Sequence, residues 1–346
     1  MKLTALAKFV DQPLIINKIS NNAPKILGGA AIALGVRDVF FKKNKSKESK
    51  SSRLLKNFVV LSSVAGASLL ASRGMKINGK QIFNGLIETV PKNLILKKQR
   101  KVIDSFVAQS NSQDVTLLKM LDKAKDKPLN LRETSYVVNK LAKDNKAEAL
   151  MSTLFGEKKD LTSKEIFSEI GRLSLLGLVP VVAGVGAGCA VDKSINKRKN
   201  NTNRIKEGFY QYFANIFLCN VGAGAALFGL EALRKKKVIN QLTPAKKFTA
   251  MIMGIVATGV VGGSFIANYL SKKIIDPIIL KKKEKLSFNK IYDERKPESL
   301  DMAMHIDDVA TAGVLSGLKW IEPVLPVFYL FSGYRAGIGY RNGIEK

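Results

Sequence analysis

Residues 173–191 read LSLLGLVPVVAGVGAGCAV, a run of 19 positions without a charged side chain. Two more uncharged runs follow, 23 positions long at 208–230 and 24 positions long at 248–271. A helix of about 20 residues spans a hydrocarbon core of about 30 Å. None of the three runs has the polar face that the surface helix of a soluble protein shows. They therefore predict three transmembrane helices.

Three other apolar segments give weaker signals. They are 57–72, which is short; 26–41, interrupted by Arg37 and Asp38; and 309–334, interrupted by Lys319 and Glu322. Each of them either spans the bilayer or lies at its interface or re-enters. We expect an all-α polytopic helical membrane protein with three to six transmembrane helices and a small helical polar insert.

The charge distribution agrees with a membrane protein. The 346 residues include 57 Lys plus Arg against 28 Asp plus Glu, a formal net charge of +29. The basic residues gather next to the apolar runs, where each is worth about 1 kcal/mol near anionic headgroups. We therefore expect a bilayer with anionic headgroups as the partner rather than a nucleic acid. The two predicted loops around 208–230 carry six basic residues each, so the positive-inside rule gives no orientation for that helix.

The composition divides the chain into four expected parts. These are an amphipathic N-terminal segment at 1–23, a helical hairpin at 24–72 that is either embedded or interfacial, a polar helical insert at 73–170, and a transmembrane bundle with basic loops at 171–346. Thr162 and Glu165 predict a capping box at the start of the helix that enters the bundle. The N-terminal segment lacks a secretory h-region. We expect this segment and the insert on the cytoplasmic side of a bacterial inner membrane or another cytoplasm-facing membrane.

Catalytic and metal sites are disfavoured by composition. Cys189 and Cys219 are the two cysteines and His305 is the one histidine. They exclude a disulfide framework, multi-histidine metal sites and histidine–cysteine zinc patterns. We predict no catalytic residue, no metal ligand and no cofactor.

Glycines four residues apart mark candidate helix-packing faces. The predicted pairs are Gly184 with Gly188, Gly259 with Gly263, Gly313 with Gly317, and Gly333 with Gly337. Such pairs let a second backbone approach closely. The second helix belongs either to the same chain or to another protomer of a homo-oligomer.

A candidate intramembrane polar site is formed by Lys319, Glu322 and Pro323. On an α-helix the two charges lie three residues apart on one face and can neutralise each other. Pro323 and Pro326 then break the helix. Broken helices beside polar groups form the substrate sites of many transporters. The alternative is that the pair lies at the interface, with Trp320 at the headgroup level.

Two function classes follow. The first is a non-enzymatic integral membrane protein that packs, anchors or organises the membrane or partner proteins. The alternative is a transporter or channel that uses the polar groups around a broken helix at Lys319–Pro326. A lipid-directed enzyme that works with Asp or Glu alone is a third, weaker interpretation.

Overall fold

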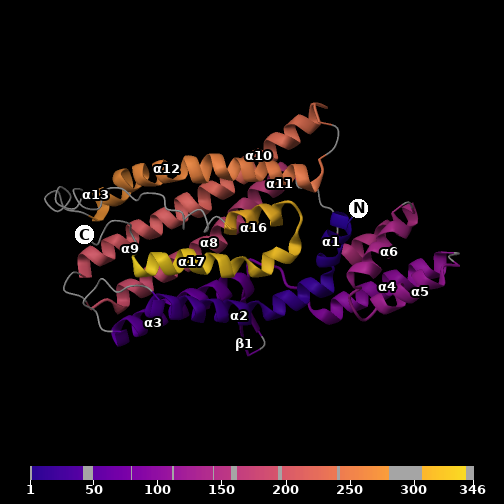
Figure 1. Cartoon of the computed structure of the whole chain (residues 1–346), viewed down its shortest axis with the longest axis horizontal. Helices are drawn as coiled ribbons and strands as arrows, with labels where there is room; N and C mark the ends of the chain where they lie inside the picture. Colours follow the sequence, from indigo (N-terminus) through magenta and orange to yellow (C-terminus); the bar gives the residue numbers. More distant parts are fainter. Residues whose placement is uncertain are drawn as a thin grey trace. The chain divides into compact units, whose positions relative to one another are not determined.

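The computed structural model is mostly helical and divides into two compact units (Figure 1). It describes residues 2–41, 50–78, 80–110, 113–142, 144–156, 162–193, 197–239, 242–279 and 306–339. Unit 1 comprises Met1–Ala23, Ile87–Asp160 and Gly317–Pro323. Unit 2 comprises Pro24–Leu86, Leu161–Ser316 and Val324–Lys346.

Unit 1 is a small helical domain with its own apolar core. Its helices are α1 (Lys2–Val10), the first half of α2 (Pro13–Val36), α4 (Lys92–Gln109), α5 (Val115–Ala124), α6 (Leu131–Leu141), η2 (Asn145–Ala147) and α7 (Glu148–Phe155). Helices α4, α5 and α6 lie side by side, and α1 packs against α6 (Figure 1). Ile103, Leu121 and Val137 are fully buried in the shared core. The N-terminal segment therefore packs with the insert instead of standing apart from it.

Two local signals organise these helices. Asp114 caps α5 by accepting a hydrogen bond from the backbone N–H of Leu117, and Asn130 forms a capping box with Glu133 at α6. Such caps satisfy N–H groups that the first helical turn leaves free. The predicted capping box of Thr162 and Glu165 is confirmed at the start of α8 (Ser163–Val191) in unit 2.

Unit 2 contains three helices that are long and apolar enough to cross a membrane, among the described residues. They are α3 (Lys50–Arg73), α8, and a continuous helix made of α9 (Lys197–Tyr212), the π-helical turn η3 (Phe213–Phe217) and α10 (Leu218–Lys235). The expected runs 173–191 and 208–230 lie in the second and third. The first contains 57–72, one of the weaker sequence signals.

The expectation for 248–271 needs correction. This run is divided into α11 (Pro244–Ile255), the π-helical turn η4 (Val256–Val261) and α12 (Gly263–Leu270), followed by η5 (Ser271–Ile275) and α13 (Asp276–Ile279). Thr258 donates its hydroxyl to the carbonyl oxygens of Gly254 and Leu218, both at 2.9 Å. A threonine hydroxyl that bonds to the carbonyl four residues earlier bends a helix. A turn at Gly262 then separates η4 from α12, and the run is not among the three membrane-length helices.

The remaining elements of unit 2 complete the bundle. They are η1 (Arg37–Phe41), α16 (Ile306–Leu315), α17 (Leu325–Ile338) and an antiparallel hairpin of β1 (Gly74–Ile77) and β2 (Lys80–Asn84). Helix α8 packs against α3, α9 and α17, and α10 packs against α11. The hairpin is a departure from the expected all-α fold.

Candidate functional site

The structure places Lys319, Glu322 and Pro323 in a short 3₁₀ helix, η6 (Lys319–Val324), and groups all three with unit 1. Lys319 is exposed and Glu322 is half-buried. The expectation of one face of a membrane α-helix is therefore wrong in its local geometry. Pro323 lies inside η6, and proline disfavours an α-helix there because it lacks the N–H that the helix needs and its ring clashes with the preceding turn. Pro326 lies in the first turn of α17, where proline is tolerated.

The η6 segment lies beside Asp11 within unit 1. The backbone N–H groups of Trp320 and Lys319 and the ammonium groups of Lys8 and Lys319 lie near the Asp11 carboxylate and favour its charged form. Burial nevertheless dominates and raises the pKa of Asp11 to about 6. Lys319 is thus one of the two lysines whose charge favours the ionised form of Asp11.

Two of the predicted glycine pairs meet each other. A β-carbon built on Gly184 would overlap the carbonyl oxygen of Gly333, and one built on Gly188 would overlap that of Gly337. Helices α8 and α17 therefore contact through their backbones at two points about one helical turn apart. This face is covered by a helix of the same chain.

The other pairs behave differently. A β-carbon at Gly259 would overlap the Cys219 sulfur, and one at Gly263 would lie 3.2 Å from the carbonyl oxygen of Ala214. Gly313 is buried in α16, but Gly317 lies beyond the end of that helix with a φ of 99°. Gly313 and Gly317 consequently do not share one helix face.

Sequence reasoning missed a row of buried polar side chains along α9–η3–α10. Asn203, Glu207, Gln211, Asn215 and Cys219 follow each other at intervals of four residues, and each is at most 4% exposed. Positions four apart form one ridge of a helix, and this one runs for about 20–25 Å. We call these five residues the polar ridge.

Hydrogen bonds connect much of the polar ridge. Asn215 donates to Oε1 of Gln211 at 2.9 Å, and Gln211 donates to Oε1 of Glu207 at 2.8 Å. At the other end, the Cys219 side chain hydrogen-bonds Asp308 of α16. Separately, Asn220 donates to the Ser174 hydroxyl on α8 at 3.0 Å. Buried polar groups in hydrocarbon require such partners.

Ion pairs lie beside the polar ridge. Nζ of Lys206 lies 2.9 Å from Oδ1 of Asp276, and both side chains are 1% exposed. Arg204 donates from Nε to the Gly337 carbonyl and from Nη1 to Asp192, both at 2.8 Å. We expected Arg204 and Lys206 in a basic loop. This was wrong, because α9 is helical from Lys197 and carries both side chains into the unit.

The polar ridge also coincides with irregular helix geometry. The π-helical turn η3 contains Asn215 and contacts both η4 and α12. A π-helical turn inside an α-helix occurs frequently at functional sites. Hydropathy alone could not find this region, because the four-residue polar spacing lies inside a run that is apolar on average.

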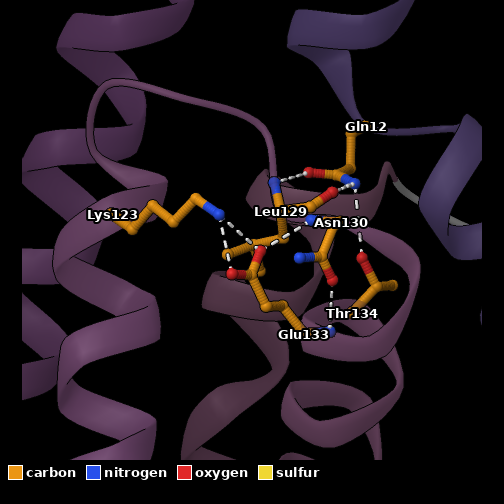
Figure 2. A network of polar contacts seen from close by, with 6 residues as sticks. All are labelled: Gln12, Lys123, Leu129, Asn130, Glu133 and Thr134. Carbon is orange, nitrogen blue, oxygen red and sulfur yellow. Dashed lines mark hydrogen bonds and ion pairs between the residues drawn. The ribbon is translucent and has the colours of Figure 1, made fainter.

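In unit 1, a buried glutamine fixes the loop between α5 and α6 (Figure 2). Gln12 accepts a hydrogen bond from the Leu129 N–H and donates to the Leu129 carbonyl, both at 2.8 Å. Its amide also donates to the Thr134 hydroxyl at 3.3 Å. Next to it, Lys123 pairs with Glu133, the residue that closes the capping box with Asn130. The loop is thus tied both to the start of α2 and to α6.

A pocket of about 330 Å³ lies beside this clamp. Three lysines line it: Lys18 from α2, Lys92 from the first position of α4, and Lys127 from the α5–α6 loop. Asn17 and Asn21 add amides. We call this cavity the lysine pocket. Its side chains can hold an anionic oxygen group.

Other chemistry finds little support. In the part of the chain that the structure describes, no three or more His, Cys, Asp or Glu residues come together in a way that could hold a metal ion. Cys189 is half-buried and Cys219 is buried, and neither forms a disulfide. His305 lies outside the described residues. The chain matches no protein-family model, no curated protein and no solved structure.

Proposed function

We propose that the protein is a non-enzymatic integral membrane protein whose unit 2 anchors the basic helical unit 1 to an anionic membrane. The observation that carries this proposal is the set of large apolar side chains that the membrane-length helices turn outward. Examples are Phe58 on α3, Val182 on α8 and Phe228 on α10, which are 66%, 60% and 45% exposed. Lipid tails suit such side chains better than water does.

Backbone packing supports the anchoring role. Helices gain little hydrophobic free energy by associating within lipid, so close glycine contacts supply van der Waals attraction instead. The contacts of Gly184 with Gly333 and of Gly188 with Gly337 serve this purpose in unit 2. Because this face is occupied within the chain, a homo-oligomer would use a different helix face.

The location follows from the same reasoning. We place unit 1, with the N-terminal segment, on the cytoplasmic side of a bacterial inner membrane or a comparable membrane. Alkaline carbonate extraction tests the insertion of unit 2, and cysteine labelling of unit 1 from each side tests the orientation. Release of the protein into the carbonate supernatant would overturn the proposal.

A second candidate function is transport through unit 2. The polar ridge favours it, because ionisable residues buried in a membrane bundle commonly mark an ion or substrate pathway. The residues that would carry it are Glu207, Gln211 and Asn215, not the predicted Lys319–Pro326 segment. Purified protein in liposomes, loaded with a pH-sensitive or cation-sensitive dye, should then show flux that Glu207→Gln abolishes. Absence of flux in the wild-type protein for protons and for monovalent cations would remove this candidate.

A further inference from the structure

We propose that the lysine pocket of unit 1 binds the phosphate group of an anionic phospholipid headgroup. The inference deepens the proposed function and rests on it, since it names the chemical group that unit 1 recognises on the membrane. Lipid headgroups and free phosphate share this chemistry, and the experiment below separates them.

Charge is the first argument. Lys18, Lys92 and Lys127 carry three positive charges into the lining, and Asp126 is its one carboxylate. Asp126 is already paired with Arg100. The lining therefore carries three positive charges against one carboxylate, which Arg100 contacts from outside the pocket.

Three lysines elsewhere in the same unit are paired with carboxylates. Lys123 pairs with Glu133, Lys125 with Asp104, and Lys140 with Asp114, at 2.6, 2.8 and 3.0 Å. Among the described residues, none of the three pocket lysines has a carboxylate oxygen within 4 Å of its ammonium group. An anion in the pocket would therefore meet cations that no internal acid has neutralised.

Shape and polarity are the second argument. Leu14, Ile15 and Pro128 line the pocket beside the lysines and asparagines. A headgroup phosphate with its glycerol and first methylene groups offers both the charge and the apolar surface that such a lining accepts. Inorganic phosphate would use the charge alone.

The pocket is also held open by fixed contacts. Gln12 clamps the loop at Leu129, two residues after Lys127. Asn17 donates to the Val90 carbonyl at 2.7 Å, which ties α2 to the segment just before Lys92. Pre-ordered walls reduce the entropy that a ligand must offset on binding.

The experiment titrates the full-length protein, purified in a non-ionic detergent, with three probes. These are dihexanoyl phosphatidylglycerol, dihexanoyl phosphatidylcholine and inorganic phosphate, with binding followed by calorimetry. The test variant is Lys18→Gln/Lys92→Gln/Lys127→Gln. The control is Lys97→Gln/Lys101→Gln/Lys146→Gln, which removes the same charge from exposed positions of unit 1 outside the pocket. Circular dichroism spectra must match across the three proteins.

We expect phosphatidylglycerol to bind the wild type and the control alike and the pocket variant about a hundredfold more weakly, at roughly 1 kcal/mol per lysine. Equal weakening in both variants would overturn the proposal, because it would show non-specific attraction. Equal affinity for phosphatidylcholine would also overturn it. Inorganic phosphate that binds as tightly as phosphatidylglycerol would overturn the lipid assignment.

The outcome is separable from the proposed function. The pocket variant should remain in the membrane pellet after carbonate extraction, because unit 2 is unchanged. A variant that stays inserted but loses headgroup binding supports the pocket. Wild-type protein that is inserted but binds no phosphatidylglycerol overturns the pocket and leaves the anchoring proposal in place.

Discussion

Gly184 on α8 lies so close to the carbonyl oxygen of Gly333 on α17 that a β-carbon at position 184 would overlap it. The obstacle is backbone, which cannot rotate away as a flexible side chain can. Gly184→Ala should therefore push the two helices apart and lower the free energy of unfolding by about 1–3 kcal/mol. Thermal unfolding in detergent, followed by circular dichroism, measures this loss.

The same helix offers a matched control. Gly186 lies two residues away, and a β-carbon there would meet nothing within 4 Å. Gly186→Ala should be neutral or stabilise the helix by up to about 1 kcal/mol, since alanine favours helix more than glycine does. Equal stability of the two variants would mean that α8 and α17 do not pack through this face.

Gln12 provides a test of unit 1. Gln12→Ala removes the hydrogen bonds to Leu129 and Thr134 and leaves buried backbone groups of Leu129 without a partner. Such groups cost about 1–3 kcal/mol. Trp320 is the single tryptophan of the chain and lies in unit 1, so its fluorescence can follow the unfolding. The exposed Gln109→Ala, on α4, should leave the transition unchanged; a similar loss in both variants would refute the clamp.

Asp11 makes unit 1 sensitive to pH. Its pKa is about 6 in the folded protein against its usual value of 3.8. Well below pH 3.8, Asp11 is protonated in both the folded and the unfolded protein, and the free energy of unfolding has its full value with respect to this group. As the pH rises toward and through 6, the unfolded chain releases its proton first, so up to about 3 kcal/mol of stability is lost.

Asp11→Asn should flatten this dependence between pH 4 and 7, with the variant more stable than the wild type at neutral pH. Trp320 fluorescence during chemical unfolding at several pH values reports the change. Glu88→Gln, an exposed substitution in the same unit, should keep the wild-type pH profile. A variant that retains the full pH dependence would show that another group titrates.

The sequence was sufficient for some of these features because their causes are local. The absence of charge in 173–191 depends on no partner, and this run lies within α8. The Thr162–Glu165 box needs only a four-residue motif, and it formed. The hairpin of β1 and β2 was missed, although Asn78–Gly79 is the dipeptide typical of a two-residue hairpin turn.

Other features depend on tertiary contacts that hydropathy averages away. Lys206 and Glu207 follow a basic stretch and look like the end of a loop, but Asp276 and Gln211 accommodate them inside unit 2. The Lys319–Glu322 spacing assumed an α-helix, but the segment forms the 3₁₀ helix η6 with Pro323 inside it. In both cases the residue types were visible, but the backbone that orients them was not.

Substitutions of the buried pair Lys206 and Asp276 test whether these charges of unit 2 have a structural role only. Removing one partner leaves an uncompensated buried charge, so Lys206→Met and Asp276→Leu should each cost about 3–5 kcal/mol. The double variant replaces both charges by apolar groups and should recover most of that loss, because the desolvation cost of both ions disappears as well. Unfolding of all four proteins in detergent gives the coupling free energy. Additive losses would show that the two side chains do not interact.

A stable double variant that also lacks the flux of the wild type in liposomes would instead connect the pair to transport.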